Sequence, residues 1–204
     1  MKTLPHLSIL ITLLLFTSCF PLANLETGRT TGQNNQYIQG NIETYFADNL
    51  TEDIDGVIPA ANIRYAYGLK PKLDIGISAS SGGNGQIFAK YQFLGNQESK
   101  FAASVGLKIG TQFLFTEDAG PLRIYFPLFL SFHPSEKIAL FLNPMYTKQM
   151  VKNDHDSDFL GLTAGSCLYF KGNELAFGAS LYNIKTGRES DNLFMLGLGY
   201  NFLF

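Results

Sequence analysis

The sequence predicts an all-β protein: a ten-stranded antiparallel up-and-down transmembrane β-barrel, with eight strands as the alternative count. Three observations lead to this prediction. Ten segments alternate apolar residues with small or polar ones, as in strands whose two faces meet different surroundings. The connections between these segments alternate between short and long, which is the plan of a membrane barrel. No apolar run of about 18 residues, the length of a membrane-spanning helix, occurs in the chain.

The composition limits the class of protein. The 204 residues suffice for one domain with a sizeable core. Hydrophobic residues make up 46% of the chain and charged residues 16%, and glycines fall inside the apolar stretches, which disfavours long helices. The net charge of −2 offers no basic surface, so nucleic acid is not expected as a partner.

The first 18 residues have the features of a secretory signal peptide. Lys2 is followed by a mostly apolar stretch at 7–16, which is too short to span a bilayer. The tetrad FTSC that ends at Cys19 resembles a bacterial lipobox, although lipoboxes usually begin with Leu. The resemblance implies that Cys19 becomes the lipid-modified first residue. The alternative is ordinary cleavage near Ala23. In either case Cys167 has no intrachain disulfide partner.

The rest of the chain divides into a linker and a barrel. Residues 19–36 are rich in Gly, Asn and Thr and show no period, so we expect a periplasmic linker there and a barrel over 37–204. In order, the predicted strands are 37–47, 58–69, 73–81, 86–94, 101–115, 122–133, 138–148, 159–170, 175–184 and 193–204.

Each strand is predicted from alternation with a period of two residues. In the second strand Ile63 and Tyr65 alternate with Arg64, and in the third Ile75 alternates with Asp74. The fifth and sixth strands show the longest patterns, in which Phe101, Ala103, Val105, Leu107, Ile109, Leu122, Ile124, Phe126, Leu128 and Leu130 lie on the apolar faces.

The lengths of the connections indicate the orientation. The connections at 70–72, 95–100, 134–137 and 171–174 are compact. Those at 48–57, 116–121, 149–158 and 185–192 are longer, and 82–85 is the one short connection on that side. With an even number of strands, both termini fall on the short-turn side, which is periplasmic in bacterial outer-membrane barrels.

The last strand carries the most specific signal. The alternating residues Leu198, Tyr200, Phe202 and Phe204 end the chain, and this pattern resembles the C-terminal assembly signal of bacterial outer-membrane proteins. The resemblance implies export to the bacterial outer membrane, contact with outer-membrane lipid and recognition by the barrel assembly machinery.

The same alternation directs charged side chains into the lumen, and they form the candidate site. These side chains are Glu43, Arg64, Asp74, Lys90, Lys108 and Arg123. We expect them to pair with one another in a polar core, because ten strands enclose little more than side chains. Folding of the first hairpin predicts an ion pair between Glu43 and Arg64, and closure of the barrel sets Glu43 against Gly197 and Gly199.

These features favour a non-catalytic structural or surface-interaction barrel with a side-chain-filled lumen. A narrow channel for small solutes is one alternative. The other is an outer-membrane enzyme that modifies lipid A or resembles the omptin proteases, because the stretch NDHDSD brings Asp154, His155, Asp156 and Asp158 together and places Ser157 close to His155. That stretch lacks the Asp-x-His spacing of omptins, and a solvated acidic loop explains it better. No cofactor or metal site is expected. Weak divalent-cation binding by the acidic loops is an open alternative.

Overall fold

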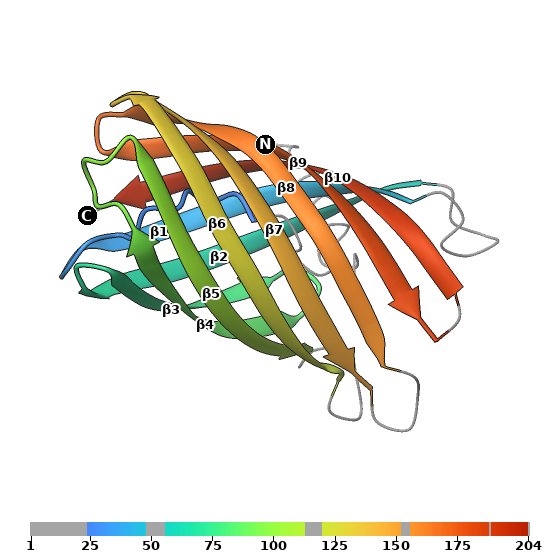
Figure 1. Cartoon of the computed structure of the whole chain (residues 1–204). Helices are drawn as coiled ribbons and strands as arrows, with labels where there is room; N and C mark the ends of the chain where they lie inside the picture. The colour runs from blue at the N-terminus through green and yellow to red at the C-terminus, as the bar shows by residue number, and fades with distance from the viewer. Residues whose placement is uncertain (1–23, 48–55, 113–119, 152–155, 188, 204) are drawn as a thin grey trace, which may run out of the picture.

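The computed structural model describes residues 24–47, 56–112, 120–151, 156–187 and 189–203. These residues form ten strands (Figure 1). No helix in this part of the chain is long and apolar enough to cross a membrane. The strands are β1 (Gln36–Ala47), β2 (Gly56–Lys70), β3 (Leu73–Ser80), β4 (Asn84–Leu94), β5 (Phe101–Gln112), β6 (Leu122–Ser135), β7 (Ile138–Met150), β8 (Ser157–Phe170), β9 (Asn173–Thr186) and β10 (Glu189–Leu203).

The strands close into a barrel in which every strand pairs antiparallel with its neighbours in the chain. The ring is completed by β1 and β10, whose register runs from Tyr37 opposite Leu203 to Phe46 opposite Phe194. Closure leaves no strand edge unpaired, which a sheet in lipid requires. The ten-stranded prediction is therefore confirmed over the eight-stranded alternative. The expected position of Glu43 opposite Gly197 is also confirmed.

The predicted strand boundaries are close to the observed ones, and most of the differences are extensions of strands into polar residues. The predicted end of the fifth strand at 115 lies outside the described residues. Strand β10 begins at Glu189 rather than at 193, and β9 extends to Thr186 rather than to 184. The additional residues form a polar ladder, with Ser190 opposite Lys185. Apolar alternation marks the part of a strand that meets an apolar environment, whereas backbone pairing continues beyond it into water.

The outer face of the barrel is apolar. Leu160, Ile63 and Leu181 are 65%, 58% and 62% exposed, although all three lie in regular strands. Outward-facing aromatic rings pair between neighbouring strands, as at Phe101 and Phe132, whose centroids are 4.7 Å apart. A continuous apolar belt flanked by aromatic rings is the surface that a bilayer covers.

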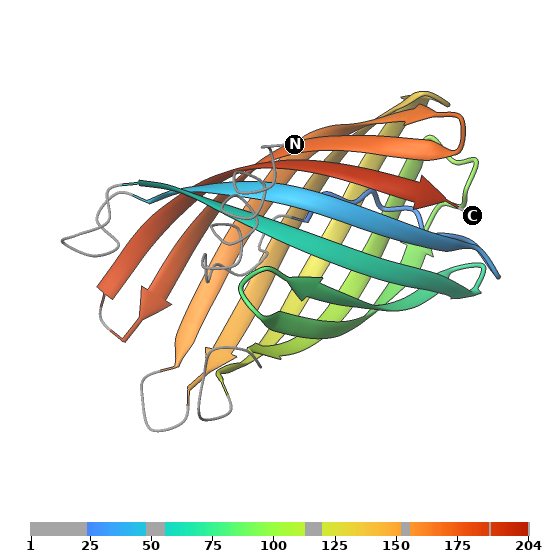
Figure 2. The same cartoon turned by 180° about the vertical axis from the view of Figure 1, so that it is seen from behind.

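The two ends of the barrel differ in their connections (Figures 1 and 2). The short turns, the start of β1 and the end of β10 lie together at one end, here called the short-turn end. The opposite end is here called the long-loop end. The residues at 48–55, 113–119 and 152–155 lie outside the described part of the chain.

The N-terminal stretch differs from the sequence-based expectation. Residues 24–35, here called the lumen segment, were expected within a periplasmic linker, but the structure places their first part inside the barrel. Asn24, Leu25 and Glu26 are 2%, 1% and 5% exposed, and Thr30 is 4% exposed. The polar composition that indicates a linker in isolation also matches the polar inner wall, which supplies partners for an irregular chain.

Candidate functional site in the barrel lumen

The lumen segment is anchored by one carboxylate that three cations share. Glu26 forms ion pairs with Arg64 of β2, with Lys90 of β4 at 3.4 Å and with Lys108 of β5 at 3.5 Å. The side chains of all four residues are no more than 12% exposed. Alternation points the three cations, here called the cation triad, to the same side of the sheet, and Glu26 is the acid on which they converge.

Aromatic rings support the cation triad from the barrel wall. The guanidinium carbon of Arg64 lies 3.7 Å from the ring centroid of Phe88. The ammonium of Lys90 lies 4.6 Å from the ring centroid of Phe129, and that of Lys108 lies 5.8 Å from the same centroid. Cation–π contacts of this kind are strengthened where water is excluded, so the rings favour the charged forms in a buried setting.

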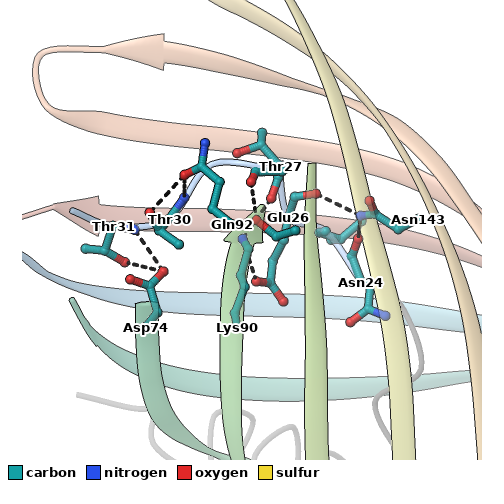
Figure 3. A network of polar contacts seen from close by, with 12 residues as sticks. Asn24, Glu26, Thr27, Thr30, Thr31, Asp74, Lys90, Gln92 and Asn143 are labelled. Carbon is teal, nitrogen blue, oxygen red and sulfur yellow. Dashed lines mark hydrogen bonds and ion pairs between the residues drawn. The ribbon is translucent and has the colours of Figure 1, made fainter. Parts of the chain in front are cut away.

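The backbone of the lumen segment is held by side chains of the barrel (Figure 3). The amide of Thr31 donates to Asp74 at 2.8 Å, and the amide of Thr30 donates to Gln92 at 3.1 Å. In the other direction, the amide of Asn143 donates to the carbonyls of Asn24 and Glu26 at 2.6 and 2.8 Å. Lumen side chains of the wall thus supply hydrogen bonds that a strand ladder would otherwise supply.

Two glycines allow the close approach of this segment. A Cβ on Gly28 would lie 2.3 Å from the carbonyl oxygen of Ala102, and one on Gly68 would lie 1.7 Å from the carbonyl oxygen of Gly32. Backbone atoms cannot move aside as a flexible side chain can. Any larger residue at either position would therefore displace the segment from the wall.

A second, apolar layer fills the lumen toward the long-loop end. Its members are buried side chains that point inward from several strands. This outer cluster consists of Tyr45, Ala60, Tyr125, Met145, Phe159, Tyr182, Leu193 and Met195. Asn24 touches this layer, because its amide lies 3.0 Å from the sulfur of Met145. The interior of the barrel is thus occupied by the polar lumen segment at one end and by the outer cluster at the other.

The structure brings three of the six predicted lumen charges together as the cation triad. Asp74 lies nearby and accepts from Thr31. Arg123 lies toward the long-loop end, where it donates to Gln149 at 2.6 Å and to Asn84 at 2.7 Å. Glu43 is 1% exposed and accepts from the hydroxyl of Tyr45 at 3.1 Å.

The ion partner of Arg64 differs from the expected one. Strand pairing sets Arg64 opposite Gln39, and it sets Glu43 opposite Ala60. The acid in contact with Arg64 is Glu26. Glu26 was missed because it lies in a stretch without period, where no pattern reports the direction of a side chain. The excess of inward cations on β2, β4 and β5 was the available signal that an acid had to come from elsewhere.

A serine and a histidine also meet inside the barrel, a contact that the sequence analysis did not find. The hydroxyl of Ser131 lies 2.9 Å from Nε2 of His133, and it accepts from the amide of Gly28 at 2.9 Å. Among the described hydrogen bonds, none joins His133 to a carboxylate, and the bond from the Gly28 amide shows that Ser131 helps to hold the lumen segment.

Most of the remaining predicted residues lie at the surface or outside the described chain, whereas Ser157 is 5% exposed and shares a hydrogen bond with Thr186 at 2.8 Å. Leu198 and Phe202 are 42% and 50% exposed on the outer face. Cys19, His155 and Phe204 fall outside the described residues. Within the ranges that the structure describes, no group of three or more His, Cys, Asp or Glu side chains is arranged to hold a metal ion.

The cavity at the short-turn end completes the site. It has a volume of about 410 Å³ and lies between the lumen segment and the barrel wall. Arg29 and Lys90 line it together with Glu26 and Glu174. Burial lowers the pKa of the Arg29 guanidinium from its ordinary value, and the phenol of Tyr169 opposes this effect. An arginine side chain nevertheless stays protonated in proteins, so Arg29 presents a positive charge to the cavity.

Comparisons with known proteins give a likeness of fold. No family model and no curated protein sequence matches the chain. The N-terminal β-barrel domain of Pseudomonas aeruginosa OprF is 15% identical over 84% of this chain and 99% of that one, with a TM-score of 0.38. An outer-membrane channel from Pseudomonas putida F1 is 11% identical over 93% and 98%, with a TM-score of 0.45. Ail, the attachment invasion locus protein of Yersinia pestis, is 16% identical over 83% and 99%, with a TM-score of 0.31.

These three chains are a β-barrel domain, an outer-membrane channel and an attachment invasion protein, and similarity at this level says nothing about the role of this chain. The closed antiparallel ring follows from the strand pairing of this chain itself. The protein therefore has the fold of the small outer-membrane β-barrels.

Proposed function

We propose that this protein is a non-catalytic barrel of the bacterial outer membrane whose lumen is closed to solutes, and that its role is structural or one of surface interaction. The observation that carries this proposal is the anchoring of Glu26 by three cations, which seats the lumen segment inside the barrel. A buried carboxylate with three cationic partners is costly to withdraw, because each partner would lose its counter-charge.

The outer cluster supports the same proposal independently. Tyr125, Tyr182 and Met195 are no more than 2% exposed, although their side chains face the lumen. A solute path would therefore require displacement of both the lumen segment and this apolar layer. The narrow-channel alternative has no comparable support among the described residues.

Planar-bilayer recording of the purified full chain tests the closed lumen. We expect no conductance steps, or only small ones, because both layers exclude a continuous water column. Large and stable openings of the unmodified chain would contradict the proposal.

Epitopes inserted near Asp53 and Asp156 should be accessible on intact cells, whereas one inserted at Lys72 should not be.

The N-terminus carries a separate part of the proposal, namely a lipid on Cys19. The lipobox-like tetrad at 16–19 supports it. The substitution Cys19→Ser should leave an uncleaved precursor of larger mass, since the lipoprotein pathway requires the thiol. An unchanged mature mass would place cleavage elsewhere and remove the lipid from the proposal.

A further inference from the structure

The cavity at the short-turn end has the dimensions of a ligand site. Its volume of about 410 Å³ falls within the range of about 300–1,000 Å³ that is typical of small-molecule pockets. One side consists of the lumen segment from Glu26 to Thr31, and the other consists of strand residues that include Tyr37, Glu174 and Asn201. Asn35 and Gln97 also line it and are exposed to solvent, so the cavity opens at this end of the barrel.

The strand wall presents a row of polar side chains at one level. Pairing sets Tyr169 opposite Glu174 on β8 and β9, and Glu174 opposite Asn201 on β9 and β10. Glu174 and Asn201 are 8% and 6% exposed. The Oδ1 atom of Asn201 is buried and has no hydrogen-bond partner among the described residues. Buried acceptors are normally satisfied, so this atom calls for a donor within the cavity.

The charges that line the cavity are only partly compensated. Glu26 and Lys90 pair with each other at 3.4 Å. Arg29 and Glu174 have no ion-pair partner within 4.0 Å in the described part of the chain, and they do not pair with each other. Arg29 donates through Nη2 to the carbonyl of Ser99 at 2.7 Å, while its buried Nε has no partner there. One cavity thus holds a cation and an anion that each lack an ion-pair partner within 4.0 Å among the described residues, although Lys90 attracts Glu174 from a greater distance.

We propose that this cavity binds a small zwitterion of the size of an amino acid or a dipeptide. Its carboxylate would lie against Arg29, whose planar guanidinium matches carboxylate geometry. Its ammonium would lie against Glu174 and donate to Asn201. A ligand that carries both charges would compensate both groups at once, whereas a purely anionic or purely cationic ligand would leave one of them unpaired. The inference rests on the seated lumen segment and on the proposed orientation, in which this end faces the periplasm.

A matched set of three probes tests the site on the purified full chain in detergent micelles. Dialanine carries both charges, N-acetylalanine lacks the ammonium, and alaninamide lacks the carboxylate. Titration calorimetry or ligand-observed NMR should show binding of dialanine, and each analogue should bind at least about tenfold more weakly. Equal binding of all three probes, or no binding of dialanine up to about 10 mM, would overturn the proposal.

Two substitutions locate the binding. Glu174→Gln and Arg29→Gln should each weaken dialanine binding by about tenfold or more, while Glu98→Gln and Lys137→Gln, on exposed turns at the same end, should leave it unchanged. Binding that survives both lumen substitutions would contradict the site. If Glu174→Gln fails to fold, Arg29→Gln and the probe series on the unmodified chain remain decisive. Failure of the closed-barrel proposal would appear instead as bilayer conductance.

Discussion

Glu26 of the lumen segment and Arg64 of β2 form an ion pair inside the barrel, where their side chains are 5% and 6% exposed. The pair joins residues on the two sides of the start of β1, so it ties an irregular stretch to the wall of a closed sheet. Because the pair is buried, its contribution to the free energy of unfolding is large enough to measure. Breaking a buried pair on one side costs about 3–5 kcal/mol, because the partner stays buried without its counter-charge.

The first prediction concerns this pair. Glu26→Gln and Arg64→Gln should each lower the unfolding free energy by about 3 kcal/mol or more, as measured by circular dichroism during urea unfolding in micelles. The double variant should lose less than the sum, because the two residues share one interaction. Glu98→Gln on an exposed turn serves as the control. Additive losses would show that Glu26 is not coupled to Arg64.

The second prediction concerns the seat of the lumen segment. Gly28→Ala should displace it, because the new Cβ would lie 2.3 Å from a backbone oxygen. Cys167 reports the displacement, since its buried thiol shares a cluster with Leu25. Labelling of Cys167 by a small thiol reagent, followed by peptide mass spectrometry, should become about tenfold faster or more. This is the change expected when the free energy of the local opening that exposes the thiol falls by about 1.4 kcal/mol.

Gly40→Ala is the matched control, because a Cβ at that position meets nothing within 4 Å. It should leave the labelling rate of Cys167 unchanged. Equal rates in the two variants would show that the segment tolerates a side chain at 28 and is held less tightly against the barrel wall than its contacts indicate.

The third prediction separates the two layers of the lumen. Glu26→Gln alone should conduct little in planar bilayers, because the outer cluster still fills the long-loop half. Tyr125→Ala with Tyr182→Ala should likewise conduct little while the lumen segment stays seated. The combination of all three substitutions should open a measurable path. Conductance from either set alone would show that only one layer closes the barrel.

The fourth prediction concerns assembly. Deletion of Phe204 should reduce the amount of folded barrel in the outer membrane, because it removes the terminal aromatic residue of the expected assembly signal. Phe204→Tyr, which keeps an aromatic ring, is the control. The measurement is the intensity of the band of unheated, folded protein when membrane fractions are separated by gel electrophoresis. Normal levels after the deletion would remove Phe204 from that signal.

The barrel itself could be predicted from the sequence because alternation is a local property. Each strand of a closed barrel meets lipid on one face and the lumen on the other, so a period of two residues survives in every strand, from Ile63 next to Arg64 to Phe202 next to Asn201. The even number of strands and the alternating connection lengths leave few possible topologies. A closed antiparallel barrel fits both observations and leaves no strand edge unpaired in lipid. The outward and inward assignment of charged residues follows from the same rule.

The partners of those residues were decided only by the tertiary structure. Glu26 lies in a stretch without period, and no local pattern shows that this stretch enters the lumen. Nor does any local pattern show that Glu26 meets cations from β2, β4 and β5 there. The register between strands decided that Arg64 lies opposite Gln39. The cavity beside Arg29 and Glu174 exists because one irregular segment covers part of a closed wall. Local sequence determines which face a strand residue takes, whereas a contact between distant segments depends on the free energy of the whole packed lumen.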